Sequence, residues 1–335
     1  MIAHATLALP LLIALVALAL AFDFVNGVHD SANSIATVVS TRLLGPMQAV
    51  AFAAFFNFAA YWIFGLKVAA TVGKGIVDAH VVTPQVVFGA LVGAMAWNVF
   101  TWWRGIPSSS SHALIGGLLG AGVTHAGWHA VVWGGVNKTV LAIVISPLVG
   151  LFVSMALMLL TSWLFQRVTA RGAEAMFKPL HLLSAAAYSV GHGANDAQKT
   201  MGIIAVLLFS QGLVGSHFHV PGWVVVGCYI AMALGTLAGG WKIIQTMGSR
   251  ITRLDQHQAF CASAGGSIML FSASALGVPV STTHTIMGCV VGVGAARRAS
   301  AVRWSVASRV VVAWLVTIPA SAAVGAVIYL LVAAL

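Results

Sequence analysis

The chain has 335 residues, of which 60% are hydrophobic and only 7% are charged, and its mean hydropathy is +0.99. A soluble globular domain carries about 25% charged residues, so this composition excludes that class and predicts an integral membrane protein. The net charge of +10 comes from scattered Lys and Arg, many of them at the ends of apolar runs, which indicates loops facing the cytoplasm and no nucleic-acid partner.

Long apolar runs, and no repeated alternation of the kind that builds an outer-membrane barrel, predict an all-α polytopic membrane protein. At roughly 20 residues per span, about ten to twelve membrane segments fit into the chain. We expect the first helix over 5–24, a break near Asn26-Gly27, and a second piece ending at Arg42. Glycine with polar neighbours at membrane depth is typical of a discontinuous helix that lines a cavity. The further segments expected in the first half are 47–66, a weak one at 67–78, 84–103, 105–122 and 138–165.

Residues 166–178 form the most polar connection, with Arg167, Arg171 and Lys178 opposed only by Glu174. We expect this short basic connection in the cytoplasm, between a first membrane half over 1–165 and a second over 179–335. The segments expected in the second half are 179–209, 223–244, 260–276, 277–284 leading into a further apolar run, and a last span ending at 335.

A motif around an aspartate occurs twice in the chain. The sequence Asn-Gly-Val-His-Asp-Ser-Ala-Asn at 26–33 has a partner in His-Gly-Ala-Asn-Asp-Ala-Gln-Lys at 192–199, and both place Gly-x-x-Asp in an apolar context. The chain has only six acidic residues, and two of them are Asp30 and Asp196. Because a carboxylate at membrane depth costs at least several kcal/mol, both are predicted to be functional.

A second motif is also duplicated, as 105–116 and 277–288. Pro279 follows Pro107 by 172 residues, and Asp196 follows Asp30 by 166, so two motifs recur in the same order at similar offsets. This duplication predicts a transporter with two pseudo-symmetric halves. The number of crossings between the halves is uncertain at the weak segment near Lys74, so the motifs alone leave a parallel or an inverted repeat open.

The second motif has the composition of a helix start, because proline fits the first turn and hydroxyls cap free N–H groups. In a half-helix that points inward, those N–H groups and the helix dipole form an anion site. Ordinary capping, or packing by small residues, is the alternative, but the duplication favours the anion site. The hydroxyls expected to bind a tetrahedral oxyanion are those of Ser109, Ser110, Ser111, Ser281, Thr282 and Thr283.

Asp30 and Asp196 cannot bind an anion directly, but they can hold a cation or a proton that travels with it. Asn26, Asn33 and Asn195 add neutral oxygens, which suit a small hard cation. A structural role for the aspartates, capping a broken helix, is the alternative. For Asp23 an interfacial or structural role is left open.

Histidines adjoin all four motif copies and could handle protons, but for each of them alone a structural role is the more common outcome. The remaining histidines form no metal set, so we expect neither a resident metal nor a cofactor. These four histidines are His29, His112, His192 and His284.

At these motifs the chain resembles the inorganic phosphate transporter family of the Pit type, whose hallmark is a duplicated Gly-x-Asn-Asp-like motif. The stretches at 26–37 and 192–202 are similar to its two copies, the Pro-x-Ser-Thr-Thr-His stretch also matches, and the likeness covers nearly the whole chain. It implies an inverted repeat, two re-entrant hairpins, phosphate bound between the halves, and a homodimer. It also implies a multi-pass protein in contact with lipid in the bacterial cytoplasmic membrane.

Two departures from the family pattern concern the coupling ion. Sodium-coupled relatives tend to carry Asn three residues after each aspartate, whereas this chain has Asn33 but Lys199. Many relatives also carry a glutamate on the helix after each motif, and our alignment puts Asn57 and Ser263 there. An ammonium can replace a sodium, neutralise Asp196 or contact phosphate.

Fewer carboxylates give fewer cation sites. We therefore expect phosphate import by cation symport, with a proton favoured over sodium, as free phosphate or a metal–phosphate complex. In this interpretation Asn195 and Lys199 join the phosphate-binding set, and Asn26 and Asn33 join Asp30 and Asp196 at the coupling ion.

Two other classes compete with this interpretation. An ion channel or metal-ion transporter is the alternative among transport proteins. An intramembrane enzyme is suggested by Ser111 beside His112, but adjacent helical residues point about 100° apart, and the duplicated copy has Thr283 in place of the serine. We therefore expect no enzymatic activity.

Overall fold

The computed structural model describes residues 8–215 and 217–334, and these residues form twelve α-helices and no β-strand beyond one isolated bridge between Val77 and Val131. Short helical turns join several of them: η1 (Ala60–Trp62), η2 (Ala79–Val81), η3 (Trp128–Ala130), η4 (Thr246–Arg250) and η5 (Ala299–Ala301). The helices are α1 (Leu9–Ser40), α2 (Pro46–Ala59), α3 (Lys67–Gly75), α4 (Pro84–Arg104), α5 (Ser110–Ala126), α6 (Trp133–Leu164), α7 (Ala170–Ser210), α8 (Gly222–Ala238), α9 (Trp241–Gln245), α10 (Gln256–Leu276), α11 (Thr282–Arg297) and α12 (Trp304–Ala333).

The architecture is the all-α membrane bundle that the composition predicts. By length and composition, α1, α4, α6, α10 and α12 can each cross a membrane, while α2 with η1 and α3 form a pair bent by 85°. Helices suit a lipid environment because the backbone N–H and C=O groups, apart from those at the helix ends, are bonded within the segment. The predicted start of the first helix at residue 5 lies outside the described residues.

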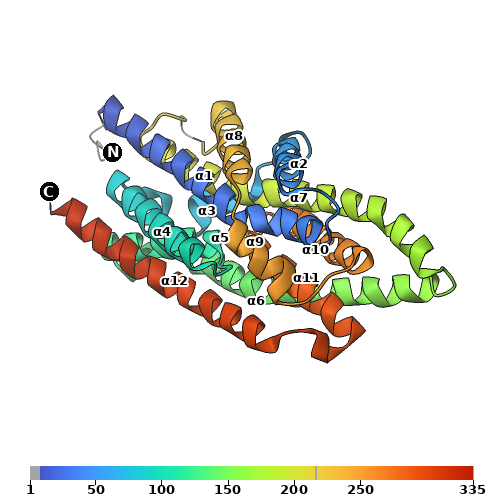
Figure 1. The fold of residues 1–335 in the computed structure, drawn as a ribbon. Coiled ribbons are helices and arrows are strands. Elements are labelled where there is room, and N and C mark those ends of the chain that lie inside the picture. The colour runs from blue at the N-terminus through green and yellow to red at the C-terminus, as the bar shows by residue number, and fades with distance from the viewer. Residues whose placement is uncertain (1–7, 216, 335) are drawn as a thin grey trace.

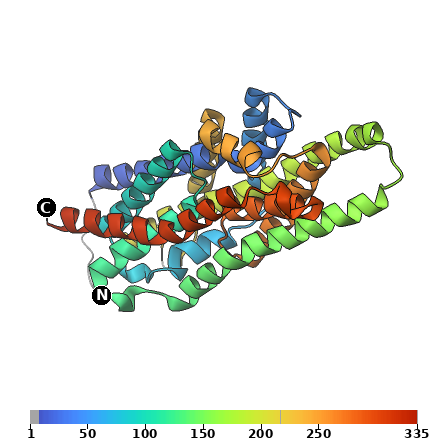
Figure 2. The same cartoon turned by 60° about the horizontal axis from the view of Figure 1, so that its bottom comes forward.

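The long helices of the first half point in the opposite direction to those of the second half. In Figure 1, α1 and α6 run from the end of the bundle that holds the marked termini toward the opposite end, whereas α7 and α12 run back. Figure 2 shows the turn between α6 and α7 at the end opposite the termini. The connection expected over 166–178 is shorter in the structure, because α7 begins at Ala170 and residues 170–178 are helical.

Equivalent contacts recur with the roles of the halves exchanged. Thr71 in the first half donates to the carbonyl of Gly277 at 2.8 Å, and Thr246 in the second half donates to the carbonyl of Gly105 at 3.1 Å. The two glycines end α10 and α4 in the left-handed conformation, with φ of 68° and 65°. Each half therefore holds the turn that precedes the other half's Ser- and Thr-rich motif.

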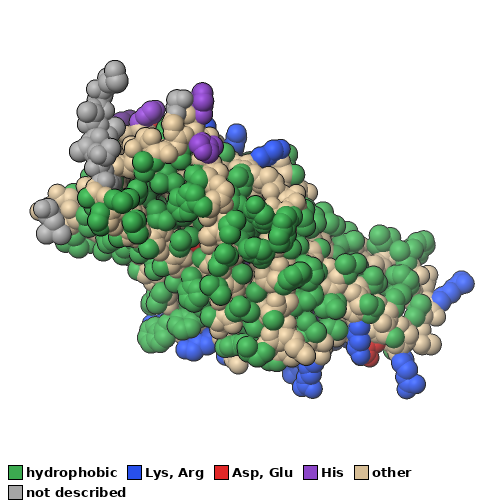
Figure 3. Space-filling model, turned by 90° about the horizontal axis from the view of Figure 1, so that it is seen from above, with side chains coloured by type: hydrophobic (Ala, Val, Ile, Leu, Met, Phe, Trp, Pro, Cys, Tyr) green, Lys and Arg blue, Asp and Glu red, His purple; other side chains and the backbone are tan. Residues whose placement is uncertain are grey.

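Large apolar side chains cover the outside of the bundle, whereas its interior contains polar and small side chains as well as apolar ones. Figure 3 shows a face dominated by hydrophobic side chains, with Lys and Arg along its edges. On α12, Leu315 is 72% exposed while Thr317 and Ser321 are buried, and Thr317 accepts a hydrogen bond from the Trp97 indole at 3.0 Å. This distribution suits a lipid environment, where small residues let helices approach closely and polar side chains bond across helices.

Candidate functional site

The two aspartate motifs lie inside continuous helices, α1 and α7. The predicted break at Asn26-Gly27 is therefore wrong, because the glycine serves close packing between helices. A Cβ at Gly27 would lie 2.3 Å from the carbonyl oxygen of Met232 on α8, and one at Gly193 would lie 2.3 Å from that of Asn57 on α2. Each motif helix is thus pressed against a helix of the other half.

The chain is interrupted at the Ser- and Thr-rich motifs instead. Ser109 caps α5 by accepting from the backbone N–H of His112 at 3.2 Å, and Ser281 caps α11 by accepting from that of His284 at 3.1 Å. Both helix starts are buried, so their free N–H groups lie inside the protein. The predicted helix starts are confirmed, although Pro107 and Pro279 precede the caps and are not in the first turn.

Asp30 is buried and accepts hydrogen bonds from both halves of the chain. Ser110 donates to its Oδ2 at 2.7 Å, and Thr283 donates to its Oδ1 at 3.2 Å. The ring of His29 lies 2.9 Å from the same Oδ1. Ser110 and Thr283 come from the starts of α5 and α11, so this carboxylate joins the two duplicated motifs.

Asp196 has the corresponding place on α7 but a different environment. Thr282 donates to its Oδ2 at 2.7 Å, and Nε2 of His192 lies 3.2 Å from the same oxygen. The ammonium of Lys199 donates to its Oδ1, to the hydroxyl of Ser111, and to the carbonyl of Val280 at 2.7 Å. Lys199 is only 3% exposed, so it neutralises Asp196 inside the protein.

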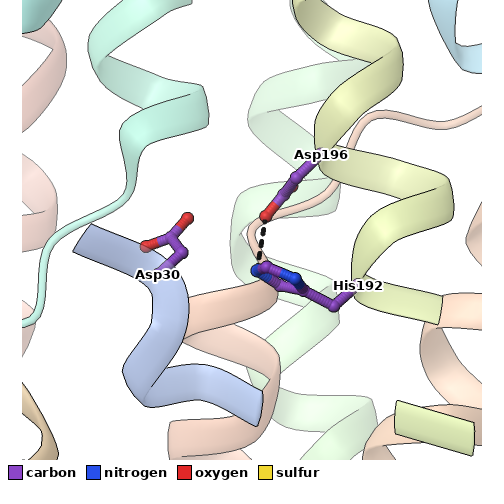
Figure 4. A group of neighbouring side chains, drawn as sticks. All are labelled: Asp30, His192 and Asp196. Carbon is purple, nitrogen blue, oxygen red and sulfur yellow. Dashed lines mark ion pairs between the residues drawn. The ribbon is translucent and has the colours of Figure 1, made fainter. Parts of the chain in front are cut away.

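The two aspartates belong to one site. Ligand atoms of Asp30, His192 and Asp196 all lie within 4.8 Å of one another. Figure 4 shows Asp30 on α1 opposite His192 and Asp196 on α7. Asn33 donates to the hydroxyls of Thr282 and Thr283 at 3.2 and 2.9 Å. The duplicated motifs therefore converge on a single polar centre between the halves.

The predicted site residues divide by what they contact. Ser110, Ser111, Thr282 and Thr283 place their hydroxyls around the aspartates and Lys199, and Asn26 accepts from Ser110 at 2.5 Å. Ser109 and Ser281 act as caps. Asn195 supports the segment before α11, because its Oδ1 accepts from the N–H of Val280 at 3.2 Å and its Nδ2 donates to the carbonyl of Val278 at 3.3 Å.

Two histidines belong to the site although a structural role was expected for them, and Ser263 lies on another helix than the one expected. His29 and His192 each contact an aspartate, and their adjacency to both motif copies was the available signal. Ser263 lies on α10 and not on the helix that follows the second motif helix, which is α8. On α2, Asn57 donates a hydrogen bond to the hydroxyl of Thr236 on α8 at 3.2 Å.

The geometry argues against a serine nucleophile. Ser111 accepts from Lys199, whereas the ring of His112 packs against that of His284 with centroids 4.5 Å apart. What the site offers is electrostatic: hydroxyl donors, an ammonium and two helix starts for an anion, and carboxylates for a cation. Many secondary transporters hold their substrate at a buried polar centre of this kind, between two parts of a membrane bundle.

Comparison with known proteins identifies the family. The profile of the phosphate transporter family matches residues 26–325. A protein of Rhizobium meliloti named "probable low-affinity inorganic phosphate transporter" is 61% identical over 97% of both chains, and a protein of Bacillus subtilis with the same name is 41% identical over 95% of this chain and 96% of its own. A solved structure titled as the sodium-dependent phosphate transporter has a TM-score of 0.89 and 26% identity, covering 98% of this chain and all of its own.

The chain belongs to the phosphate transporter family. It is a multi-pass membrane transporter and not an enzyme, as the sequence predicts.

Proposed function

We propose that this transporter imports inorganic phosphate in symport with a cation, and that the cation is a proton. The observation that carries the proposal is Lys199, which bonds at once to Asp196 on α7, to Ser111 at the start of α5, and to the segment before α11. A fixed positive charge thus lies where two inward helix starts meet, an arrangement suited to an oxyanion.

Phosphate would bind at the hydroxyls around this ammonium. Ser110 and Ser111 come from the first half, and Thr282 and Thr283 come from the second. An anion held by both halves is released only when they move apart, which fits alternating access around a central site. The opposite directions of α1 and α7 in Figure 1 support an inverted repeat.

Lys199 also supports a proton over sodium. Its ammonium pairs with Asp196, and the pair as a whole has no net charge with which to attract a sodium ion. Asp30 has two hydroxyl donors and His29, and it needs no metal ion to satisfy its oxygens. The solved relative is titled as sodium-dependent, and the lysine is the feature of this chain that favours a different coupling ion.

A metal–phosphate complex is a second candidate cargo, favoured by the close approach of Asp30, His192 and Asp196. Carboxylate and imidazole groups could hold a divalent cation that arrives with phosphate. Removing divalent cations with a chelator would then stop uptake, while free phosphate as the cargo predicts unchanged uptake.

The family resemblance also implies a homodimer. Light scattering in detergent would then give a protein mass twice that of the monomer.

The deciding experiment for the coupling ion is uptake of radiolabelled phosphate into proteoliposomes with one imposed gradient at a time. We expect accumulation with an inward proton gradient in sodium-free buffer, and competition by arsenate, which has the same shape and charge. A strict requirement for sodium would refute proton symport. Cation uptake in the absence of phosphate would instead indicate a channel or metal-ion transporter.

A further inference from the structure

Asp23 is a buried carboxyl group that lies outside the site described above. It lies on α1, two turns before Asp30, and its exposed fraction is 0%. Neither of its oxygens has a hydrogen-bond partner within the described residues. Asn26, Thr200 and Cys228 face the carboxyl group, and the hydroxyl of Thr200 also lacks a partner.

The surroundings of Asp23 supply no positive charge to balance it. The titratable groups that face it are Asp196 on α7 and Cys228 and Tyr229 on α8. Lys199 is next to Thr200 in sequence, but its ammonium is directed to Asp196, Ser111 and Val280. The groups that face Asp23 are neutral or acidic, and an ionised carboxylate that is buried without a cation is strongly unfavourable, so this environment selects the neutral acid.

From this geometry we infer that Asp23 carries a proton in the closed form of the transporter and is the group that binds the coupling proton. The inference deepens the proposed proton symport and rests on it. Protonation removes the unbalanced charge, and it gives the carboxyl group an O–H donor that the hydroxyl of Thr200 can accept. No other co-reactant is required, because the step is the binding of one proton to one carboxylate oxygen.

The same position is poorly suited to a metal cation. A small hard cation takes several oxygen ligands, but Oδ1 of Asn26 already accepts from Ser110 and the third neighbour is a thiol. Asp23 and Thr200 alone would leave the ion short of ligands. The composition of the pocket therefore favours a proton over sodium.

Asp23 also lies where its burial depends on the contact between the halves. One turn after it on the same helix, Gly27 packs so tightly on α8 that a Cβ would lie 3.0 Å from the Cα of Gly235. α1 belongs to the first half, and α7 and α8 belong to the second. Separation of the halves would expose the carboxyl group to water and allow the proton to leave, which links its protonation to the transport cycle.

The test is Asp23→Asn, which keeps the shape of the side chain and cannot bind a proton. In proteoliposomes we expect this variant to keep phosphate–phosphate exchange at equal pH and to lose accumulation driven by a proton gradient. Asp23→Glu retains a titratable group, so it should retain coupling. Asp78→Asn is the matched control, because Asp78 is an acid before η2 whose side chain accepts from the exposed N–H of His80, and it should behave as wild type.

A separate readout distinguishes failure of this inference from failure of proton symport. We expect infrared spectra of the wild type to contain a protonated-carboxyl band that Asp23→Asn removes and Asp78→Asn retains. If a proton gradient drives equal phosphate accumulation by the wild type and by Asp23→Asn, then Asp23 is not the coupling group, although proton symport is still correct. If the wild type requires sodium, proton symport is wrong, and the absence of the infrared band would show in addition that Asp23 is not protonated.

Discussion

At the scale of single residues, the charge balance of the site depends on Lys199. Its ammonium is buried with Asp196, and burying either charge alone would cost far more than burying the pair. Thr282 and His192 remain near the carboxylate, but neither carries a fixed positive charge. The stability of the protein and the charge of its binding site therefore depend on the same two side chains.

Removal of one partner should accordingly destabilise the fold. We expect Lys199→Met to lower the free energy of unfolding by about 3 kcal/mol, because it leaves Asp196 ionised and unpaired. The double variant Lys199→Met with Asp196→Asn should recover most of this loss while transporting no phosphate. Unfolding in detergent, followed by circular dichroism, measures the stability of the wild type and of the two variants. Equal stability of these three proteins would contradict a buried ion pair.

The aspartates themselves give a second test at this scale. Asp30→Asn should abolish phosphate uptake with little loss of folded protein, because it removes the charge and keeps the shape. Asp196→Asn should also abolish uptake, but it should lower the stability as well, because it leaves the buried ammonium of Lys199 unpaired. Uptake by the purified variants in proteoliposomes, with their elution from size-exclusion chromatography as the control for folding, measures this. Normal uptake by both variants would exclude the assigned roles.

At the scale of helices, the positions of the duplicated motifs were predictable but the continuity of their helices was not. Apolar runs and hydroxyl caps locate the spans and the starts of α5 and α11 from local sequence alone. Gly27 looks locally like a break, and its actual role depends on Met232 and Gly235, far away in the chain. Likewise, the pairing of Lys199 with Ser111 arises only when the halves meet.

The close helix crossings predict that a methyl group added at either glycine lowers the stability of the protein. Gly27→Ala and Gly193→Ala should each cost about 1–3 kcal/mol of stability, because a Cβ would meet backbone atoms that cannot rotate away. Gly65→Ala is the control, since a Cβ there would meet no atom within 4 Å. Thermal unfolding of the three variants in the same detergent compares them, and equal melting temperatures would disprove packing as the reason for these glycines.

At the scale of the whole molecule, the two halves exchange contacts and close one site between them. Lys67 of the first half donates to the carbonyl of Ala275 near the end of α10 at 3.0 Å, and Lys242 of the second half donates to that of Trp103 near the end of α4 at 3.2 Å. Each half thus contacts the end of the helix that precedes the other half's Ser- and Thr-rich motif, and the buried centre between the starts of α5 and α11 is the place where phosphate is expected.

The location of the bound anion tests this account most directly. Arsenate has the geometry of phosphate and scatters X-rays anomalously, so crystals grown with it would show the arsenic position without reference to transport. We expect a single strong peak between the starts of α5 and α11, within hydrogen-bonding distance of Ser111, Thr283 and Lys199. A peak found only in the cavity of about 250 Å³ at Arg104, Arg250 and Arg309 would contradict a shared central site.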